Sequence, residues 1–360
     1  MGIKNLNNLL RKNCPHVFEE IHLSEYAFKK VAIDVSLFLC KFKAICGDNW
    51  LTSFVNLVQC LRKNDIHCVF IFDNGSPNEK SIEKEERIKS REKTEQRVLE
   101  LSNALDNYYK TGEVELILLE LHDKLIKTSI PIQRLLSKKR PQSTVNMDIV
   151  KDKIEKMKNY NIKISKDDFE KTRELFDILK VPYYIAPLEA ECMCADLCKR
   201  NIVDAVLTED TDVLAYGSPV FLSKIDTKND TCVRILHKTV LDSLNLTQEQ
   251  FLDLCIMCGC DYNKNIPKVG CETSFKYITK YKSIDEIARN ETIDITILNH
   301  KRTRDLFINY ERHEIKNILY CGSPDFSELE KFIIDNNIKI NLEKLRKSFI
   351  HDIIFIEDDE

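Results

Sequence analysis

Acidic residues follow apolar segments at several places in this chain, and one stretch carries three of them. The stretch "VLTEDTDVL" (206–214) contains Glu209, Asp210 and Asp212 and no basic residue. Carboxylates that crowd at the end of an apolar segment repel one another and resist the loss of water. Because side chains alternate along an extended chain, Asp210 and Asp212 are expected on one side and Glu209 on the other. The pattern therefore predicts a nearby positive charge.

Five further acids hold comparable positions. Two end strand-like runs, two open a helical pattern, and one follows an apolar helical segment: Asp34, Asp73, Glu189, Glu191 and Asp261. Each alone fits a helix cap or a surface residue. With Asp210 and Asp212 they make seven carboxylates, which cannot all ionise in one place without hard cations. Mg²⁺ prefers oxygen ligands, and two such ions can clamp the attacking and leaving oxygens of a phosphoryl displacement.

Three segments share the plan of a short apolar run that ends in an acid: 29–40, 67–77 and 204–212. Continuous apolar runs of this length are typical of strands buried on both faces of a parallel sheet. Helical patterns such as 50–64 lie between them, and the chain after Asp261 is mostly helical in pattern. The alternation predicts an α/β fold. Such sheets place their sites at the carboxyl ends of the strands, so the acids are expected to meet there.

Charge is distributed unevenly along the 360 residues. The formal net charge is −4, but 124–166 holds twelve Lys/Arg against three Asp/Glu (+9), and 181–261 holds six against thirteen (−7). The basic segment suits a nucleic-acid partner, which the acidic total alone would argue against. It also fits a solvated, lysine-rich insertion. Part of it, around 137–146, is expected to be mobile.

Composition excludes several classes of protein. The chain is 43% hydrophobic and 31% charged, as globular proteins are. No apolar run reaches the roughly 18 to 20 residues that span a bilayer, and a signal-peptide pattern is missing, so no membrane association is expected. Fourteen cysteines then predict free thiols in a reducing interior. Cys255 and Cys258 form a C-x-x-C pair without a second pair at zinc-site spacing, so no zinc is expected. The acidic end "IEDDE" (356–360) is expected to fray.

A highly charged helical segment follows Asp73. Residues 79–100 hold seven basic and seven acidic residues, which alone indicates an exposed, ion-paired helix. Lys80 and Arg87 lie in this segment. Seven residues make nearly two helical turns, so their side chains would face the same way.

The assembled motifs resemble the flap-endonuclease family of structure-specific 5′ nucleases (XPG/RAD2 type). The matching pieces, in the family's order, are "MGIKNL", "VAID", "FDNGSP", "LEAEC", "TEDTD" and "GCDY". They cover about 1–91 and 170–290, and their combination is highly specific although no single piece is.

The resemblance implies a PIN-like α/β nuclease with a mostly parallel central sheet, a helical arch insertion and a helix–two-turn–helix region that binds DNA. The implied division is a nuclease region at 1–91, an enlarged, partly mobile arch at 92–169, a second nuclease region at 170–262 and the helical region at 263–360, all in one catalytic domain.

The resemblance also implies two catalytic Mg²⁺ ions, which Mn²⁺ can replace. We expect the seven acids to divide into two sets: Asp34, Asp73, Glu189 and Glu191 around one ion, and Asp210, Asp212 and Asp261 around the other. Lys80 and Arg87, seven and fourteen residues after Asp73, match the family's pair that reaches the scissile phosphate. Their charge would stabilise the charge that develops there.

The chain departs from the family pattern at three places. The gap from Asp73 to Glu189 is 116 residues, so the arch is expected to be enlarged, and its basic segment would grip a strand. Cys40 replaces a stacking tyrosine of compact members, which leaves Phe38 or Phe42 to stack on a base.

The third departure concerns the family's G-[IV]-G-P core, which reads "IPKVGCETS" (266–274) here. Lys268 and Cys271 replace the first glycine and the proline, while Gly270 remains. DNA contact is still expected at Lys268 and Gly270, and also at Gly2, whereas binding of K⁺ is in doubt. A sliding-clamp peptide is not recognisable near the C-terminus.

The predicted function is hydrolysis of DNA near single-strand/double-strand junctions, as a flap endonuclease or 5′–3′ exonuclease in replication, repair or recombination. The partner would be DNA with a 5′ flap, gap or junction, the protein a monomer, and its location intracellular, either nuclear or cytoplasmic. Viral members of the family exist, so a viral origin also fits. Four alternatives stay open: a four-way-junction enzyme, a bubble-specific enzyme, a catalytically silent DNA-binding scaffold, or a 5′–3′ exoribonuclease.

Overall fold

The computed structural model describes residues 2–129, 145–161 and 163–349, and these divide into two compact units. The first unit comprises Met1–Phe42, Asp48–Glu83 and Ile164–Glu360, and the second comprises Lys43–Gly47 and Lys84–Lys163. Two segments singled out from the sequence lie mostly or wholly outside the described residues, namely 137–146 and 356–360. The four-part division of the chain given above remains a proposal.

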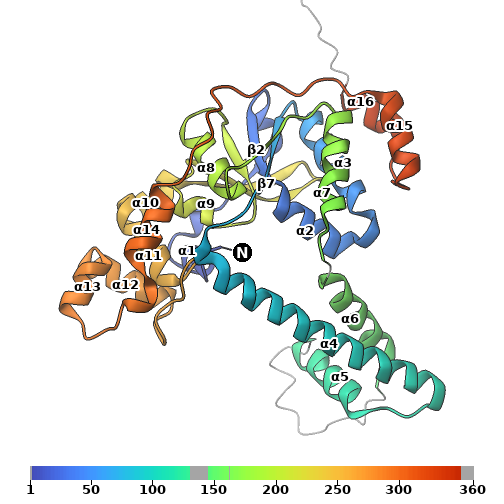
Figure 1. Cartoon of the computed structure of the whole chain (residues 1–360), viewed down its shortest axis with the longest axis horizontal. Helices are drawn as coiled ribbons and strands as arrows, with labels where there is room; N and C mark the ends of the chain where they lie inside the picture. The colour runs from blue at the N-terminus through green and yellow to red at the C-terminus, as the bar shows by residue number, and fades with distance from the viewer. Residues whose placement is uncertain (1, 130–144, 162, 350–360) are drawn as a thin grey trace, which may run out of the picture. The chain divides into compact units, whose positions relative to one another are not determined.

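A seven-stranded sheet is the centre of the first unit, in the order β1-β7-β6-β5-β2-β3-β4 (Figure 1). The strands are β1 (Glu19–His22), β2 (Lys30–Asp34), β3 (His67–Phe72), β4 (Tyr183–Ile185), β5 (Ala205–Leu207), β6 (Val220–Asp226) and β7 (Thr231–Leu236). The five strands β6, β5, β2, β3 and β4, which are adjacent in that order, pair parallel with one another. Strand β7 pairs antiparallel with both β6 and β1. The predicted mostly parallel α/β sheet is confirmed.

Side chains of the central strands alternate between two hydrophobic cores. Val31 and Ile33 of β2 enter one core, and Ala32 between them enters the other. One core holds residues of α2 (Val35–Cys46), α3 (Trp50–Lys63), α7 (Lys166–Ile178) and α15 (Phe326–Asp335). The other holds residues of α1 (Leu6–Asn13), α8 (Ala190–Lys199), α11 (Gln248–Cys258) and α12 (Cys271–Tyr281). Figure 1 shows α3 and α7 on one side of the sheet and α8 on the other. Burial on both faces explains why these strands read as continuous apolar runs.

Five further helices complete the first unit: α9 (Asp212–Ala215), α10 (His237–Leu244), α13 (Ile284–Asn290), α14 (His300–Ile308) and α16 (Leu342–Lys347). Between Asp261 and residue 349 the elements of the described chain are helices, as the pattern predicted, and a non-helical stretch at 309–325 separates α14 from α15. In the part of the chain that the structure describes, every helix is too short or too polar to cross a membrane.

The second unit has a small helical core of its own. It contains most of α4 (Ser81–Thr111), together with α5 (Leu116–Ser129) and α6 (Met147–Tyr160). Leu101, Leu118, Val150 and Ile154 are among the buried residues that hold the three helices together. Asn146 caps α6, because its side chain accepts hydrogen bonds from two backbone N–H groups of the first turn. The charged segment 79–100 is therefore largely the beginning of a long helix.

His237, at the start of α10, is a buried histidine that predicts a pH dependence of stability. It is 6% exposed, and its Nε2 lies 3.0 Å from the carbonyl oxygen of Leu214, to which the neutral ring donates. Burial, aided by the charge of Lys199, lowers the pKa of His237 to about 4. The unfolded chain binds this proton near pH 6.5. The contribution of His237 to stability is therefore fully present above pH 6.5 and is lost as the pH falls toward 4.

Replacing His237 with glutamine is expected to weaken the acid-induced loss of stability. This residue alone accounts for a loss of about 2–3 kcal/mol between pH 6.5 and 4 in the wild type. Urea unfolding at pH 7, 5.5 and 4.5 measures the difference, with the exposed His22→Gln variant as control. A pH profile of H237Q that matches the wild type would contradict the expectation.

Candidate active site

Three acids follow neighbouring parallel strands and so reach the same edge of the sheet. Asp34 is the last residue of β2, Asp73 directly follows β3, and Asp210 stands three residues after β5. Strands β5, β2 and β3 are adjacent and parallel. Asp34 is 5% exposed, and its Oδ1 accepts a hydrogen bond from the Leu37 N–H, which belongs to the first turn of α2.

The N-terminus of α8 brings Glu189 and Glu191 to this edge. Glu189 is the residue that precedes the helix and Glu191 lies in its first turn, and both are buried. The backbone N–H of Ala190 donates to Oδ1 of Asp73 at 2.6 Å, which ties the helix to the end of β3. Acids are favoured at this end of a helix because its N–H groups carry partial positive charge.

Asp212 is the most deeply buried of the acids, at 1% exposure. Its backbone N–H donates to Oδ1 of Asp210 at 3.0 Å, so the turn into α9 holds the two side chains together. Both carboxylate oxygens of Asp212 are buried without a hydrogen-bond partner among the described residues. Glu209, by contrast, pairs with Lys41 of α2, so it does not share this arrangement.

Lys80 supplies positive charge within the acid cluster. Its side chain is 11% exposed, and Nζ lies 3.0 Å from Oδ2 of Asp261 and 3.5 Å from Oε1 of Glu191, in addition to an ion pair with Glu189. Burial alone would lower the pKa of Lys80, but the charges of Glu191, Glu189 and Asp261 outweigh it and raise the pKa. One ammonium therefore balances part of the negative charge of seven acids.

The remaining charge is costly to bury. Burial raises the pKa of four acids above their ordinary values: Asp34, Glu191, Asp210 and Asp212. Repulsion by Asp73 adds to the effect at Asp34, and repulsion by Asp210 adds to it at Asp212. A bound divalent cation would relieve this repulsion.

The chemistry of the donor set fits hard cations. All seven groups are carboxylates, the ligands that Mg²⁺ prefers, and Asp212 offers two oxygens without partners. Over the residues that the structure covers, no three His, Cys, Asp or Glu side chains already have donor atoms arranged to hold one ion. Lys80 lies among three of the carboxylates, those of Glu189, Glu191 and Asp261.

Tyr262 belongs to this site, although we assigned it no role from the sequence. Its hydroxyl donates to Oε2 of Glu189, and the hydroxyls of Tyr262 and Tyr216 lie 2.7 Å apart. Tyr262 directly follows Asp261 in the "GCDY" motif, and that adjacency was the available signal. Its hydrogen bond orients a predicted metal ligand.

Gly2 lies against the Asp210–Asp212 turn. Its φ is +83°, and a Cβ there would approach Oδ1 of Asp210 to 2.1 Å and the N–H of Asp212 to 2.9 Å. The position accepts only glycine for both reasons. The structure thus places Gly2 beside the acid cluster, and its predicted contact with DNA stays a prediction.

Lys268 and Gly270 lie in the connection between α11 and α12. Lys268 is exposed in the left-handed region with φ 64°, and Gly270 precedes α12 with open space around it. The side-chain amide of Asn265 donates to the carbonyl oxygens of Ile266 and Val269 in the same turn. Lys268 is exposed in this turn, and the contacts of Lys268 and Gly270 with DNA, like the doubtful K⁺ site, stay predictions.

Arg87 belongs to the part of α4 in the second unit, whereas Lys80 and the acids belong to the first. The structure therefore brings together Lys80 and acids from the predicted set, and the role of Arg87 at the phosphate remains a prediction.

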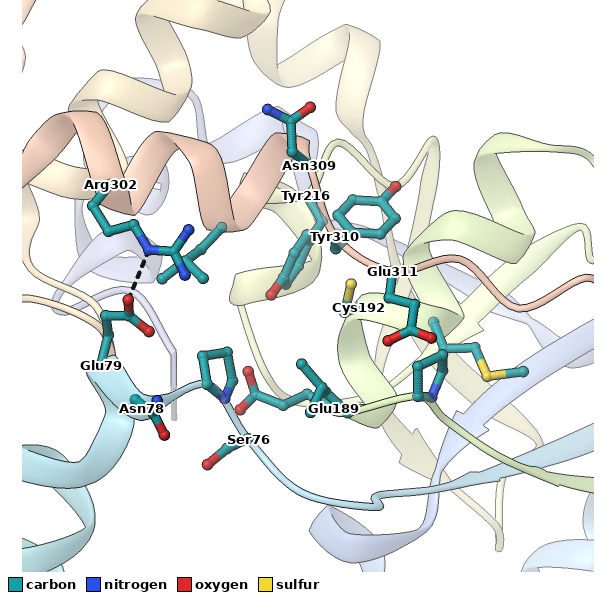
Figure 2. Close-up of a pocket in the computed structure, with 15 residues that line it drawn as sticks. Ser76, Asn78, Glu79, Glu189, Cys192, Tyr216, Arg302, Asn309, Tyr310 and Glu311 are labelled. Atoms are coloured by element: carbon teal, nitrogen blue, oxygen red, sulfur yellow. Dashed lines mark hydrogen bonds and ion pairs between the residues drawn. The ribbon is translucent and has the colours of Figure 1, made fainter.

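A pocket of about 360 Å³ adjoins the acid cluster (Figure 2). It lies between the β3–α4 connection, the start of α8 and α14, and Glu189 forms part of its wall. Arg302 of α14 forms an ion pair with Glu79, with Nε and Oε1 2.7 Å apart.

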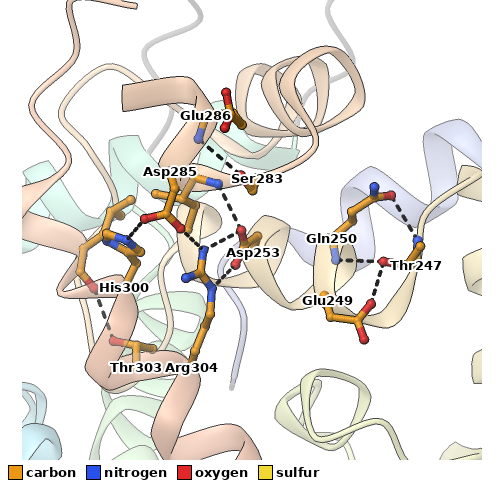
Figure 3. Close-up of polar contacts among 12 residues, drawn as sticks. Thr247, Glu249, Gln250, Asp253, Ser283, Asp285, Glu286, His300, Thr303 and Arg304 are labelled. Atoms are coloured by element: carbon orange, nitrogen blue, oxygen red, sulfur yellow. Dashed lines mark hydrogen bonds and ion pairs between the residues drawn. The ribbon is translucent and has the colours of Figure 1, made fainter. Parts of the chain in front are cut away.

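A partly buried polar network connects α11, α13 and α14 (Figure 3). The guanidinium of Arg304 in α14 donates two hydrogen bonds to Asp253 of α11, at 2.5 and 2.7 Å, and one to Asp285 of α13 at 3.0 Å. Asp253 also accepts from the N–H of Ile284 at 2.9 Å. One carboxylate thus joins three helices.

Replacing Asp253 with alanine is expected to destabilise the protein by about 3 kcal/mol. This is the lower end of the range for breaking a buried ion pair, chosen because Arg304 is one quarter exposed. The exposed Glu249→Ala variant of the same helix, which loses only a first-turn carboxylate and its hydrogen bond from Thr247, should change stability by no more than about 1 kcal/mol. Urea unfolding of both variants tests this, and equal stabilities would contradict it.

The fold is similar to those of two solved nucleases. The catalytic core of Rad2 bound to a DNA substrate is 17% identical over 97% of this chain and 99% of that chain, with a TM-score of 0.65. Flap endonuclease-1 from Methanococcus jannaschii is 19% identical over 92% and 94%, with a TM-score of 0.58. The class of fold is therefore that of the PIN-like nucleases.

Sequence comparison identifies the family within this class of fold. Residues 1–94 match the XPG N-terminal domain, and 180–261 match the XPG I-region. A probable RAD2-like endonuclease of Invertebrate iridescent virus 6 is 31% identical over 97% of this chain and 92% of its own length. A second, from Invertebrate iridescent virus 3, is 33% identical over 94% and 92%. Flap endonuclease 1 of Enterocytozoon bieneusi is 32% identical over 80% and 72%. The chain belongs to the XPG/RAD2-type flap endonuclease family, as the motifs predicted.

Proposed function

We propose that the protein is a structure-specific 5′ nuclease that hydrolyses DNA phosphodiester bonds near junctions of single and double strands. Its role would lie in DNA replication, repair or recombination inside a cell, and the protein would be encoded by a cellular or a viral genome. The observation that carries this proposal is the gathering of acids at the carboxyl edge of the sheet, with Asp212 wholly buried and both its oxygens without partners. Membership of a nuclease family supports the same reading.

The acids of this edge would hold two Mg²⁺ ions, or Mn²⁺ in their place. Bound there, the ions would supply charge stabilisation and activation of water for an in-line displacement at phosphorus. Backbone N–H groups hold three of the acids in position: that of Leu37 holds Asp34, that of Ala190 holds Asp73, and that of Asp212 holds Asp210. Glu189 is oriented by the hydroxyl of Tyr262.

Lys80 would bind and orient the scissile phosphate. Its Nζ contacts Glu189, Glu191 and Asp261, and a rotation of the side chain would exchange one of these carboxylate oxygens for a phosphate oxygen. The ammonium then neutralises charge on the phosphate in a largely desolvated place, where such interactions contribute most. Arg87 is proposed to assist it, and the exposed Lys268 to hold the duplex through a phosphate.

Chelation tests the proposal at its centre. With EDTA, the purified protein is expected to lose cleavage of a 5′-flap DNA by about 10³-fold or more, and added Mg²⁺ or Mn²⁺ restores it. Labelled DNA in a gel assay measures this, and size exclusion alongside tests the proposed monomer. Cleavage that continues unchanged in EDTA would overturn the metal scheme. Binding of flap DNA without cleavage at any metal concentration would instead indicate a silent scaffold.

A substrate panel separates the remaining alternatives. We expect a 5′ flap in DNA to be cut faster than a gap, a bubble, a four-way junction or an RNA flap. A preference for RNA would indicate an exoribonuclease. A preference for four-way junctions, with dimers forming on the substrate, would indicate a resolving enzyme. Product lengths distinguish endonucleolytic from exonucleolytic cutting.

A further inference from the structure

The ion pair between Glu79 and Arg302 joins the turn that carries Lys80 to a distant helix. Glu79 belongs to the single 3₁₀ turn Asn78–Lys80, directly before α4, and Arg302 belongs to α14. Figure 2 shows the two side chains, both part of the pocket lining, meeting in this ion pair. The partners are 223 residues apart in the sequence, so only the folded chain brings them together.

Glu79 and Lys80 point to different neighbours from the same turn. Glu79 reaches Arg302, while Lys80 enters the acid cluster and contacts Asp261 at 3.0 Å. The turn is closed by the Lys80 N–H, which donates to the Pro77 carbonyl at 3.1 Å. Glu79 and Lys80 are thus joined by one peptide unit within a closed turn.

The other end of the ion pair is firmly anchored. In α14, Thr303 and Phe307 are buried, and the neighbouring Arg304 is held by Asp253. The ring of Phe307 packs edge-on against Tyr262, which itself bonds Glu189. The helix that presents Arg302 is thus fixed to the same framework as the acids.

We propose that the Glu79–Arg302 ion pair positions Lys80 for its contact with the scissile phosphate. This proposal rests on the proposed nuclease function. Glu79 and Arg302 are positioning residues, and neither touches the reacting atoms. Because Arg302 is 48% exposed on its side chain, the ion pair contributes little to overall stability. Its effect is local, on where the ammonium of Lys80 lies, and small displacements of a catalytic group lower rates strongly.

Single-turnover cleavage of a 5′-flap DNA by saturating enzyme tests the proposal. Glu79→Gln and Arg302→Gln are each expected to lower the rate constant about threefold to fivefold, the range that an exposed ion pair allows. The double variant should be no slower than either single variant. Affinity for the flap DNA, measured in Ca²⁺, should stay within about twofold of the wild type. Additive losses in the double variant would overturn the proposal.

Two control backgrounds separate positioning from other roles. Arg302 also pairs with Asp305 at 2.5 Å, so Asp305→Asn leaves Glu79 paired and is expected to cut at close to the wild-type rate. In a Lys80→Met background, Glu79→Gln should cause no further loss, because the ion pair acts through Lys80. A further loss there overturns the proposal. So does weaker DNA binding by R302Q alone, which would make Arg302 a direct DNA contact.

A readout without DNA keeps this test independent of the nuclease function. The rate at which an amine-reactive reagent modifies Lys80, followed by mass spectrometry, should rise about threefold to fivefold in E79Q and R302Q, and not in D305N. Unchanged labelling would overturn the proposal. If the wild type fails to cut DNA while labelling responds as expected, the function is wrong and the positioning holds.

Discussion

Replacing Asp212 with asparagine is expected to lower the rate of 5′-flap cleavage by about 10³-fold or more, while the metal-free protein becomes no less stable. Within the described acid cluster, Asp212 alone has two oxygens that are both buried and without partners. The rate falls because both of these oxygens are free to bind a cation, and the substitution removes that carboxylate. Loss of a cation's charge stabilisation is a matter of several kcal/mol, and each 1.36 kcal/mol is tenfold in rate.

Without bound metal, the D212N variant should be at least as stable as the wild type. Burial raises the pKa of Asp212, and repulsion by Asp210 and Asp261 adds to this, so the charged side chain opposes folding when no metal is bound. A neutral amide of the same shape removes that repulsion, for a gain on the order of 1 kcal/mol. Thermal unfolding with EDTA should show a melting temperature equal to or above that of the wild type. With Mg²⁺, the variant should gain less than the wild type.

Glu209→Gln is the matched control, three residues earlier in the same stretch. Its carboxylate pairs with Lys41 and lies outside the cluster, so cleavage should stay within about threefold of the wild type. If D212N cuts at the wild-type rate, or if both variants lose activity equally, the assignment of the acids is wrong.

The position of the acids could be expected from the sequence because the signals are local. An apolar run that ends at Asp34, and another that stops before Asp73, identify two parallel strands and the edge where they end. The same reasoning did not reach β6 and β7. Their side chains are partly exposed and interrupted by polar residues, so no continuous apolar run marks them.

Individual ion pairs between distant segments could not be derived from local patterns, although the family resemblance placed Lys80 near the acids. Composition presented 79–100 as an exposed, ion-paired helix, and for much of α4 the residues are indeed exposed. Lys80 stands just before the helix begins and is buried among acids that lie more than a hundred residues further on. Glu79, in the same turn as Lys80, pairs with Arg302 of α14, more than two hundred residues further along the chain. Such ion pairs depend on tertiary packing, which no local pattern encodes.

Lys80→Met is expected to lower the rate of flap cleavage by about 10²–10³-fold and at the same time to tighten binding of divalent cations. The rate falls because the phosphate loses a positioned charge, an interaction whose removal costs about this much in comparable sites. Metal binding tightens because the ammonium that contacts Glu189, Glu191 and Asp261 no longer competes for their oxygens. At these separations the effect on affinity is about tenfold.

Calorimetric titration of DNA-free protein with Ca²⁺ or Mn²⁺ measures the second effect apart from cleavage. Without metal, K80M leaves three carboxylates without their cation, so its melting temperature should fall, and Mg²⁺ should raise it further than it raises that of the wild type. Lys84→Gln, an exposed charge one turn along the chain, is the control and should change none of these quantities. Weaker metal binding by K80M would mean that Lys80 organises the carboxylates instead of competing with the ions, and the exchange between carboxylate and phosphate proposed for it would then be wrong.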